Sequence, residues 1–326
     1  MKKKLKIIIP AAALLCIAFW LFYPFTFKLP KYELPEDNIK ISVTYNDDTL
    51  IALCSKSFRK YDAHGGTTVV LPSEYSYSDL CAVSSDDIMF LDLNGNVIHY
   101  VNGNFDETNY HNIKSVCYVV GSYLFLDIDG NVYNEDGLIC TLDNAEKLLG
   151  SPEADFALKN IMYSDGTDLY NCNILSGKTE CLENYTEAEI NICGAMAAAD
   201  GKLFGFFPPE RKFKETEYSK NTEITHITSR IHGQGYLILN KSGKIESLGL
   251  DSDGDLIKGR KISSSGETSF SYFNPLRNDL VHCQGYVRLV NGITSVDNIY
   301  SSPQGGLHIN QQLIFIQSGN NIFLYY

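Results

Sequence analysis

The stretch that decides the fold is His232-Gly-Gln-Gly-Tyr-Leu-Ile-Leu-Asn-Lys-Ser-Gly-Lys-Ile-Glu-Ser-Leu-Gly249, because it recurs along the chain. It reads as an apolar strand, a tight turn at Gly243 and a second strand. A shorter copy follows as His282-Cys-Gln-Gly-Tyr-Val-Arg-Leu-Val-Asn-Gly292, and earlier copies span residues 88–98 and 121–133. A strand–turn–strand unit that recurs in this way is typical of repeat architectures.

The spacing of the turns favours a β-propeller. Glycine turns recur through most of the chain, at Gly95, Gly130, Gly166, Gly201, Gly243, Gly292 and Gly319. Repeats of about 35–50 residues that hold about four short strands are typical of propeller blades. We therefore expect an all-β propeller of about seven blades, with six to eight compatible. Its ring would close by pairing residues 39–45 beside 313–316 and 321–326. A pair of β-sandwiches is the structural alternative, since alternating strands fit both.

One repeat resembles a known family. Gly243-Lys-Ile-Glu-Ser-Leu-Gly249 followed by Asp251-Ser-Asp-Gly-Asp-Leu-Ile-Lys-Gly259 is similar to the blade of the RCC1 (regulator of chromosome condensation) family. Leu248 stands where that family has Trp, and Asp255 stands where it has Gln. The other repeats keep only the apolar strand and the glycine turn. The resemblance implies a propeller used for protein interaction, and the family's nucleotide-exchange activity is not carried over.

The N-terminus is typical of a membrane anchor. Residues 1–6 are a basic tail, residues 7–27 carry no charged side chain, and residues 28–38 form a linker with two prolines before the propeller at 39–326. At about 1.5 Å per residue, the uncharged run spans roughly 30 Å, which is the thickness of a bilayer core. A cleaved signal peptide is the alternative, but the aromatic residues at 19–27 differ from a small-residue cleavage site. We expect a single-pass protein of the cell membrane, with a cytoplasmic N-terminus and an extracytoplasmic propeller.

The charge of the chain argues against nucleic acid as a partner. The formal net charge is −12, and without the four N-terminal lysines it falls to −16 (23 basic against 39 acidic residues). An acidic body repels phosphate backbones.

One disulfide is predicted from hairpin geometry. If Ser176-Gly177 forms a two-residue turn, Cys172 and Cys181 face each other as a non-hydrogen-bonded pair. The Cα atoms of such a pair lie about 4.5 Å apart, within disulfide range. The cysteines that lie in apolar runs are interpreted as small buried hydrophobic residues.

No catalytic motif, metal motif or cofactor fingerprint is found in the sequence, and we predict no cofactor. The seven histidines are scattered and form neither H-E-x-x-H nor H-x-H. The sequence therefore favours a membrane-anchored propeller that binds or scaffolds an unknown protein at the cell surface. Two alternatives are an enzyme of lyase or hydrolase type with its site in the propeller channel, and a binder of cell-wall glycan.

Overall fold

The computed structural model describes residues 31–119, 121–150, 160–191, 194–207, 211–216, 223–229, 235–241, 245–250, 256–257, 269–274, 279–284, 287–289, 296–301 and 314–325. Every regular element in these ranges is a β-strand. No helix within them could cross a membrane, and the expected anchor at 7–27 lies outside the described residues.

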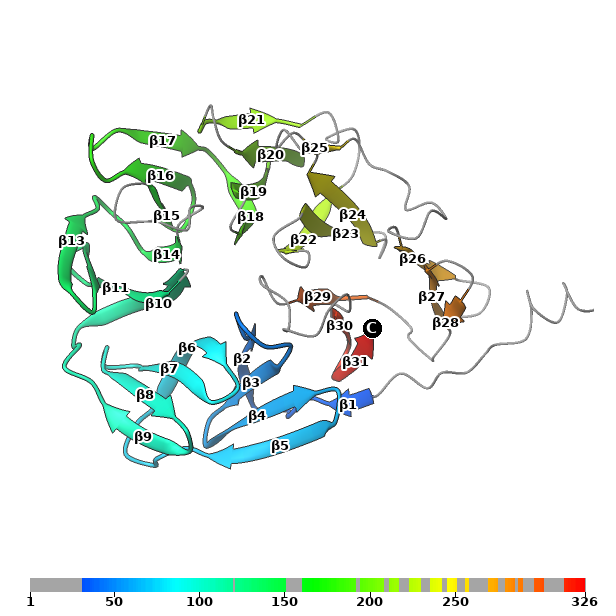
Figure 1. Cartoon of the computed structure of the whole chain (residues 1–326), viewed down its shortest axis with the longest axis horizontal. Coiled ribbons are helices and arrows are strands. Elements are labelled where there is room, and N and C mark those ends of the chain that lie inside the picture. The colour runs from blue at the N-terminus through cyan, green and yellow to red at the C-terminus, as the bar shows by residue number, and fades with distance from the viewer. Residues whose placement is uncertain are drawn as a thin grey trace, which may run out of the picture.

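The strands form antiparallel sheets arranged around a common centre (Figure 1). We number the sheets in chain order, and the first five each have four strands. The first sheet holds β2 (Asn38–Val43), β3 (Leu50–Cys54), β4 (Ser57–Asp62) and β5 (Gly65–Val70). The second holds β6 (Tyr77–Ser84), β7 (Asp87–Asp92), β8 (Val97–Val101) and β9 (Asn104–Glu107). The third holds β10 (Ile113–Val119), β11 (Ser122–Asp127), β12 (Asn131–Asn134) and β13 (Gly137–Thr141).

The remaining sheets continue around the ring. The fourth holds β14 (Lys147–Gly150), β15 (Asn160–Ser164), β16 (Leu169–Asn173) and β17 (Thr179–Leu182). The fifth holds β18 (Tyr185–Asn191), β19 (Gly194–Ala199), β20 (Lys202–Phe206) and β21 (Phe213–Glu215). The sixth holds β22 (Ile224–Ser229), β23 (Gly235–Asn240), β24 (Ile245–Leu250), β25 (Leu256–Ile257), β26 (Ser269–Asn274), β27 (Asp279–Gln284) and β28 (Val287–Leu289). The seventh holds β29 (Asn298–Ser301), β30 (Ile314–Ser318), β31 (Asn321–Tyr325) and β1 (Lys31–Glu33).

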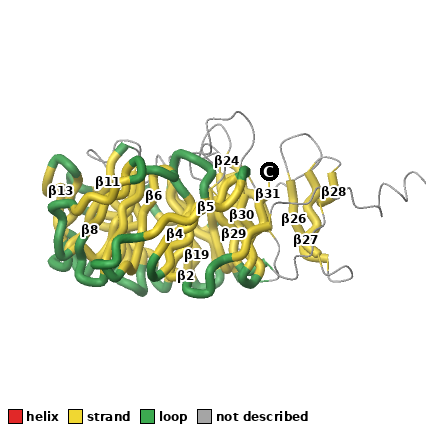
Figure 2. The backbone as a smooth tube through the Cα atoms, turned by 90° about the horizontal axis from the view of Figure 1, so that it is seen from below, coloured by secondary structure: helices red, strands yellow, loops and turns green. Residues whose placement is uncertain are grey.

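The first strand of each sheet lies nearest the centre (Figure 1). These inner strands contact one another in the order β2, β6, β10, β14, β18, β22, β29 and back to β2, which closes the ring. An edge-on view shows the sheets standing side by side in one layer, with turns along both rims (Figure 2). The predicted all-β propeller is therefore confirmed.

The ring closes through a strand in the segment that the sequence predicts to be a linker. Lys31–Glu33 forms β1 and pairs with β31, with Tyr32 opposite Ile322. The expected closing segment 39–45 instead contributes most of β2, the inner strand of the first sheet. Leu34, just after β1, is buried in a cluster with Phe315 and Leu324. The last sheet is thus built from both ends of the described chain.

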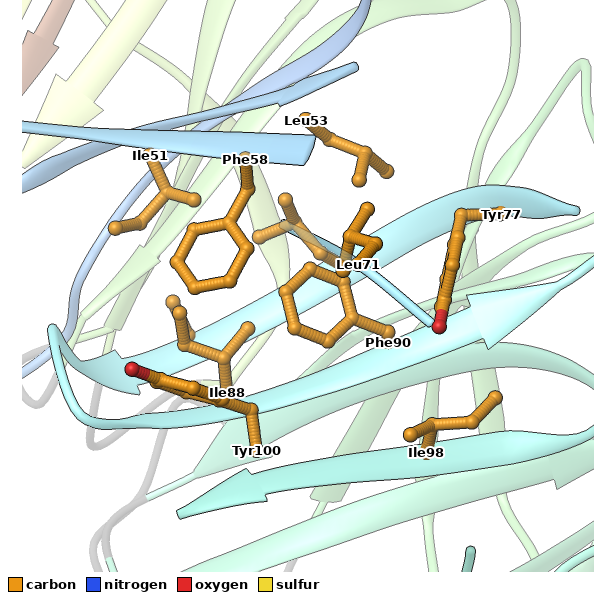
Figure 3. Packing of buried hydrophobic residues seen from close by; sticks show 11 residues of the cluster. Ile51, Leu53, Phe58, Leu71, Tyr77, Ile88, Phe90, Ile98 and Tyr100 are labelled. Atoms are coloured by element: carbon orange, nitrogen blue, oxygen red, sulfur yellow. The ribbon is translucent and has the colours of Figure 1, made fainter. Parts of the chain in front are cut away.

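The hydrophobic core lies between neighbouring sheets. Between the first and second sheets, Phe58 packs against Phe90 at 5.1 Å between ring centroids, and Tyr77 meets the same Phe90 ring edge-on (Figure 3). The second strand of a sheet is buried on both faces, as in Leu50–Cys54. This explains why such strands read as continuous apolar runs rather than as alternating ones.

Antiparallel order gives the ring two distinct faces. One carries the connectors between sheets and the turn between the second and third strands of each sheet, and we call it the connector face. The other, here called the opposite face, carries the remaining turns. Backbone hydrogen bonds join the connectors to these turns. For example, the amide of Ile113 donates to the carbonyl of Gly95 at 3.0 Å.

Three of the four quoted repeat copies match the observed hairpins β7–β8, β11–β12 and β23–β24. In the fourth copy, β27 pairs antiparallel with β28, so the chain reverses before Val287. The predicted turn at Gly292 lies outside the described residues. Of the stretch that resembles RCC1, residues 243–244, 251–255 and 258–259 lie outside the described residues.

Candidate functional site

Two turns of the connector face have the same internal structure. Asp92 ends β7, and one of its carboxylate oxygens accepts hydrogen bonds from the amides of Asn94 and Asn96 at 2.9 and 2.7 Å. The other accepts from the side chain of Asn96 at 3.0 Å. Asp127 makes the same three bonds with Asp129 and Asn131 in the third sheet. Both carboxylates are buried, so the sequence Asp-x-(Asn/Asp)-Gly-Asn fixes the shape of the turn.

Each of these turns presents an aliphatic side chain to solvent. Leu93 follows Asp92 and is 73% exposed, and Ile128 follows Asp127 and is 61% exposed. Their backbones are fixed, because the amide of Leu93 donates to Ser76 at 2.8 Å and that of Ile128 donates to Asn112 at 2.9 Å. The two side chains are therefore held outward by the fold rather than exposed by chance on a loose loop.

Leu93 and Ile128 line one hollow between the second and third sheets. Its volume is about 280 Å³, and Asp92, Ser78 and Lys114 also line it. The ammonium of Lys114 lies 3.5 Å from a carboxylate oxygen of Glu146. The hollow is thus mixed in character, with apolar rims and a paired lysine at its wall.

The aliphatic pair is specific to these two sheets. In each sheet, the first paired residue of the inner strand has a partner on the second strand. The equivalent position is the residue that follows this partner in the chain. It is occupied by polar or charged residues in the other five sheets: Ser55, Asp165, Asp200, Lys241 and Ser318. We call the connector-face surface around Leu93 and Ile128 the rim patch.

A bulge repeats near the connector face on several inner strands. The bulged residue is skipped by the pairing, and in three sheets its hydroxyl donates to a carbonyl of the second strand: Ser78 to Leu91, Thr186 to Ala198 and Thr225 to Leu239, at 3.2–3.3 Å. Ile39 and Lys114 occupy this position in the first and third sheets. Ile39 is 45% exposed, which adds a third aliphatic residue to the connector face.

A cluster of ionisable side chains joins the inner strands of the fifth, sixth and seventh sheets. The hydroxyl of Ser229 donates to Glu189 at 2.6 Å, and a ring nitrogen of His226 lies 3.1 Å from a carboxylate oxygen of Glu187. The ring of Tyr300 meets that of His226 edge-on at 5.6 Å. Burial raises the pKa of Glu189 to about 7, although Ser229 and His226 act to lower it. These groups are paired with one another, so they link neighbouring sheets.

The predicted hairpin register at Cys172 and Cys181 is wrong by two residues. Cys172 lies opposite Thr179, and Cys181 lies opposite Tyr170. Asn173 explains the shift, because its side-chain oxygen accepts from the amide and hydroxyl of Ser176 and stabilises a longer loop than a two-residue turn. Both cysteines are free thiols in the structure, and the pairing that argued for a bridge between them is not formed.

Across the ranges that the structure describes, no group of three or more His, Cys, Asp or Glu side chains is placed to hold a metal ion. The sequence predicts no binding residues, so the rim patch emerges from the structure alone. The pattern that indicates it is an apolar residue between Asp and Asn-Gly or Asp-Gly, in two successive repeats.

No family model and no curated protein matches the chain. Solved structures do match it, and they are propellers of the WD40 type. A chain of the mitotic checkpoint complex aligns with a TM-score of 0.56 and 8% identity, covering 92% of this chain and 93% of that one. The computationally designed Ika8 protein aligns with a TM-score of 0.50 and 11% identity over 91% and 98% of the two chains. Hsv2 of Kluyveromyces lactis aligns with a TM-score of 0.52 and 9% identity over 78% and 97%. At these identities the likeness shows the fold alone.

Proposed function

We propose that this chain is a protein-binding propeller and that the rim patch is part of its binding surface. The observation that carries the proposal is the pair Leu93 and Ile128, two exposed aliphatic side chains on rigid turns that flank one hollow. Contiguous exposed apolar surface that is rimmed by polar groups marks interaction sites. Complete burial of one such side chain contributes about 1.5–3 kcal/mol, so the pair could anchor a partner.

The ring suits this role physically. Its sheets are tied together by buried clusters and by a closing strand, so its turns are presented on a rigid support. Rigid presentation lowers the entropy lost on binding. One similar solved structure belongs to the mitotic checkpoint complex, a protein assembly. We further propose that the propeller has seven blades, with β26–β28 as an extension of the sixth; the support is the ring of contacts among seven inner strands.

Membrane attachment is a further part of the proposal. The support is the uncharged run 7–27, which lies between a lysine-rich tail and Lys28. The positive-inside rule then places the propeller outside the cytoplasm, where a protein partner at the cell surface could reach the rim patch. The RCC1-like character of the repeat ending at Gly259 is likewise proposed, on the sequence match at 243–249.

Site-specific photo-crosslinking tests the binding surface. A photoreactive amino acid replaces Leu93, Ile128 or Leu175 in the full-length protein in its own cells. Leu175 is the matched control, because it is 70% exposed but lies in the β16–β17 turn of the opposite face. We expect one protein species to be cross-linked from positions 93 and 128 and not from 175. Equal cross-linking from all three positions, or from 175 alone, would refute the rim patch as the binding surface.

A further inference from the structure

The surroundings of the rim patch indicate the chemistry of its partner, and the inference rests on the proposed function above. Five connecting segments form the connector face of the second and third sheets: residues 71–76, 93–96, 108–112, 128–130 and 142–146. They contain four carboxylate side chains, Glu74, Asp129, Asp143 and Glu146, and neither Lys nor Arg. All four of these residues are exposed.

The local charge is therefore negative, although the exposed Lys147 follows Glu146 at the start of β14. The buried carboxylates of Asp92 and Asp127 lie directly beneath the two turns. The lysine that lines the hollow, Lys114, is already paired with Glu146. Opposite charges on a partner would be attracted to this surface before contact, which raises the association rate and selects orientation.

We propose that the rim patch binds a segment of a partner protein that carries two apolar side chains flanked by lysine or arginine. The apolar side chains would pack against Leu93 and Ile128 over the hollow between the second and third sheets. The basic side chains would lie over the exposed carboxylates, with Asp129 adjacent to Ile128 and Glu74 close to Ser76, whose carbonyl holds the amide of Leu93. The aliphatic contacts would provide most of the affinity, and the charges would provide the preference among partners.

Acidic or neutral apolar segments fit this surface less well. An acidic segment would be repelled by the exposed carboxylates, and a neutral one would leave Glu74, Asp129 and Asp143 without counter-charges, since Lys114 is paired with Glu146 alone. Because the carboxylates are exposed, salt screens them with a Debye length of about 8–10 Å near physiological ionic strength. Binding of the expected segment should therefore weaken several-fold as salt rises from 50 to 300 mM.

A displayed library of random 12-residue peptides provides the test, selected on the full-length chain. Three variants serve as comparisons. The double substitution L93S/I128S removes the aliphatic pair. E74K/D129K reverses two charges beside the patch, and E135K/D136K makes the same change of +4 in net charge on the exposed β12–β13 turn of the opposite face. All four proteins are compared by circular dichroism and thermal melting to establish that they are folded.

The expected result is enrichment of peptides with two apolar residues and net positive charge. Their affinity should fall at least tenfold in L93S/I128S and several-fold in E74K/D129K, and should change less than twofold in E135K/D136K. Peptides that need Leu93 and Ile128 but are neutral or acidic would overturn the basic-segment inference and leave the binding surface standing. Peptides that bind L93S/I128S as well as the native chain, or no enrichment at all, would overturn both.

Discussion

Gly130 and Leu142 approach so closely that a Cβ atom added to Gly130 would lie 2.4 Å from the carbonyl oxygen of Leu142. The amide of Leu142 also donates to the carbonyl of Gly130 at 2.8 Å. The turn that presents Ile128 is thus locked to the connector that leads into the fourth sheet. Gly130 has a positive φ of 87°, which is the second reason for glycine at this position.

Substituting Gly130→Ala should destabilise the ring more than its backbone conformation alone requires. Gly166 is the matched control, since it lies in the equivalent turn of the fourth sheet with a φ of 96° and no atom within 4 Å of an added Cβ. We expect Gly166→Ala to cost about 1 kcal/mol, from the left-handed backbone, and Gly130→Ala to cost more, from the clash. Urea unfolding of both variants measures the difference. Equal costs would show that the Gly130–Leu142 approach is not tight in the molecule.

Leu34 reports on closure of the ring. It is 5% exposed and packs in a cluster with Leu50, Phe315, Ile322 and Leu324, which come from the first and seventh sheets. Leu34→Ala should therefore cost about 2–4 kcal/mol, as expected for a buried leucine. Val70→Ala, at a position that is 75% exposed, should cost less than about 0.5 kcal/mol. If the two variants have the same melting temperature, β1 is not docked against β31.

Local sequence predicted the hairpins with Asp-x-x-Gly-Asn turns because Asp92 and Asp127 bond to the turn itself, so the information is contained in five residues. It did not predict β1, since this three-residue strand of Lys, Tyr and Glu has its strand partner, β31, almost 300 residues away and is also held by a contact of Tyr32 with the first sheet. The register at Cys172 was missed because the loop depends on the side chain of Asn173 rather than on Gly177 alone. The rim patch was missed because it depends on two turns lying in adjacent sheets.

Asp127 should make the ring sensitive to acid. Burial acts to raise the pKa of this carboxyl, but hydrogen bonds from Asn131, Tyr133 and the amide of Asp129 outweigh it and hold the pKa below its usual value. A carboxyl whose pKa is lowered by folding stabilises the folded state at pH values above its unfolded pKa of about 3.9. This stabilisation is lost as the pH falls through the folded-state pKa. Asp127→Asn should be destabilised at pH 7 and lose less stability than the native chain between pH 5 and pH 3.

The control for this experiment is Asp136→Asn in the exposed β12–β13 turn, and urea unfolding at several pH values is the measurement. The control should follow the native pH profile. If the unfolding free energy of Asp127→Asn changes with pH in parallel with that of the native chain, the turn carboxylate does not contribute to acid sensitivity.

Glu189 should give the stability of the ring the opposite pH dependence. Its pKa is raised by burial to about 7 from 4.5, so the folded state binds the proton more tightly than the unfolded state does. The resulting stability is fully present below about pH 4.5 and is lost as pH rises to about 7. Among the described residues around it, the charged or titratable neighbours are Glu187, His226 and Tyr300, since the paired strand β19 holds only Gly, Ala and Met.

Glu189→Gln keeps an oxygen that can accept the hydrogen bond from Ser229, but it removes the charge. We expect this variant to be more stable than the native chain at pH 8, by roughly 1–3 kcal/mol, and to match it near pH 4.5. Thermal melting from pH 4.5 to pH 8.5 measures the effect, with Asp129→Asn as an exposed control that should leave the profile unchanged. The melting temperature of the native chain should fall relative to that of Glu189→Gln between pH 4.5 and pH 7. If it does not, Glu189 is ionised in the folded ring throughout this range. The cluster between β18 and β22 would then be held by charge pairing rather than by a protonated carboxyl group.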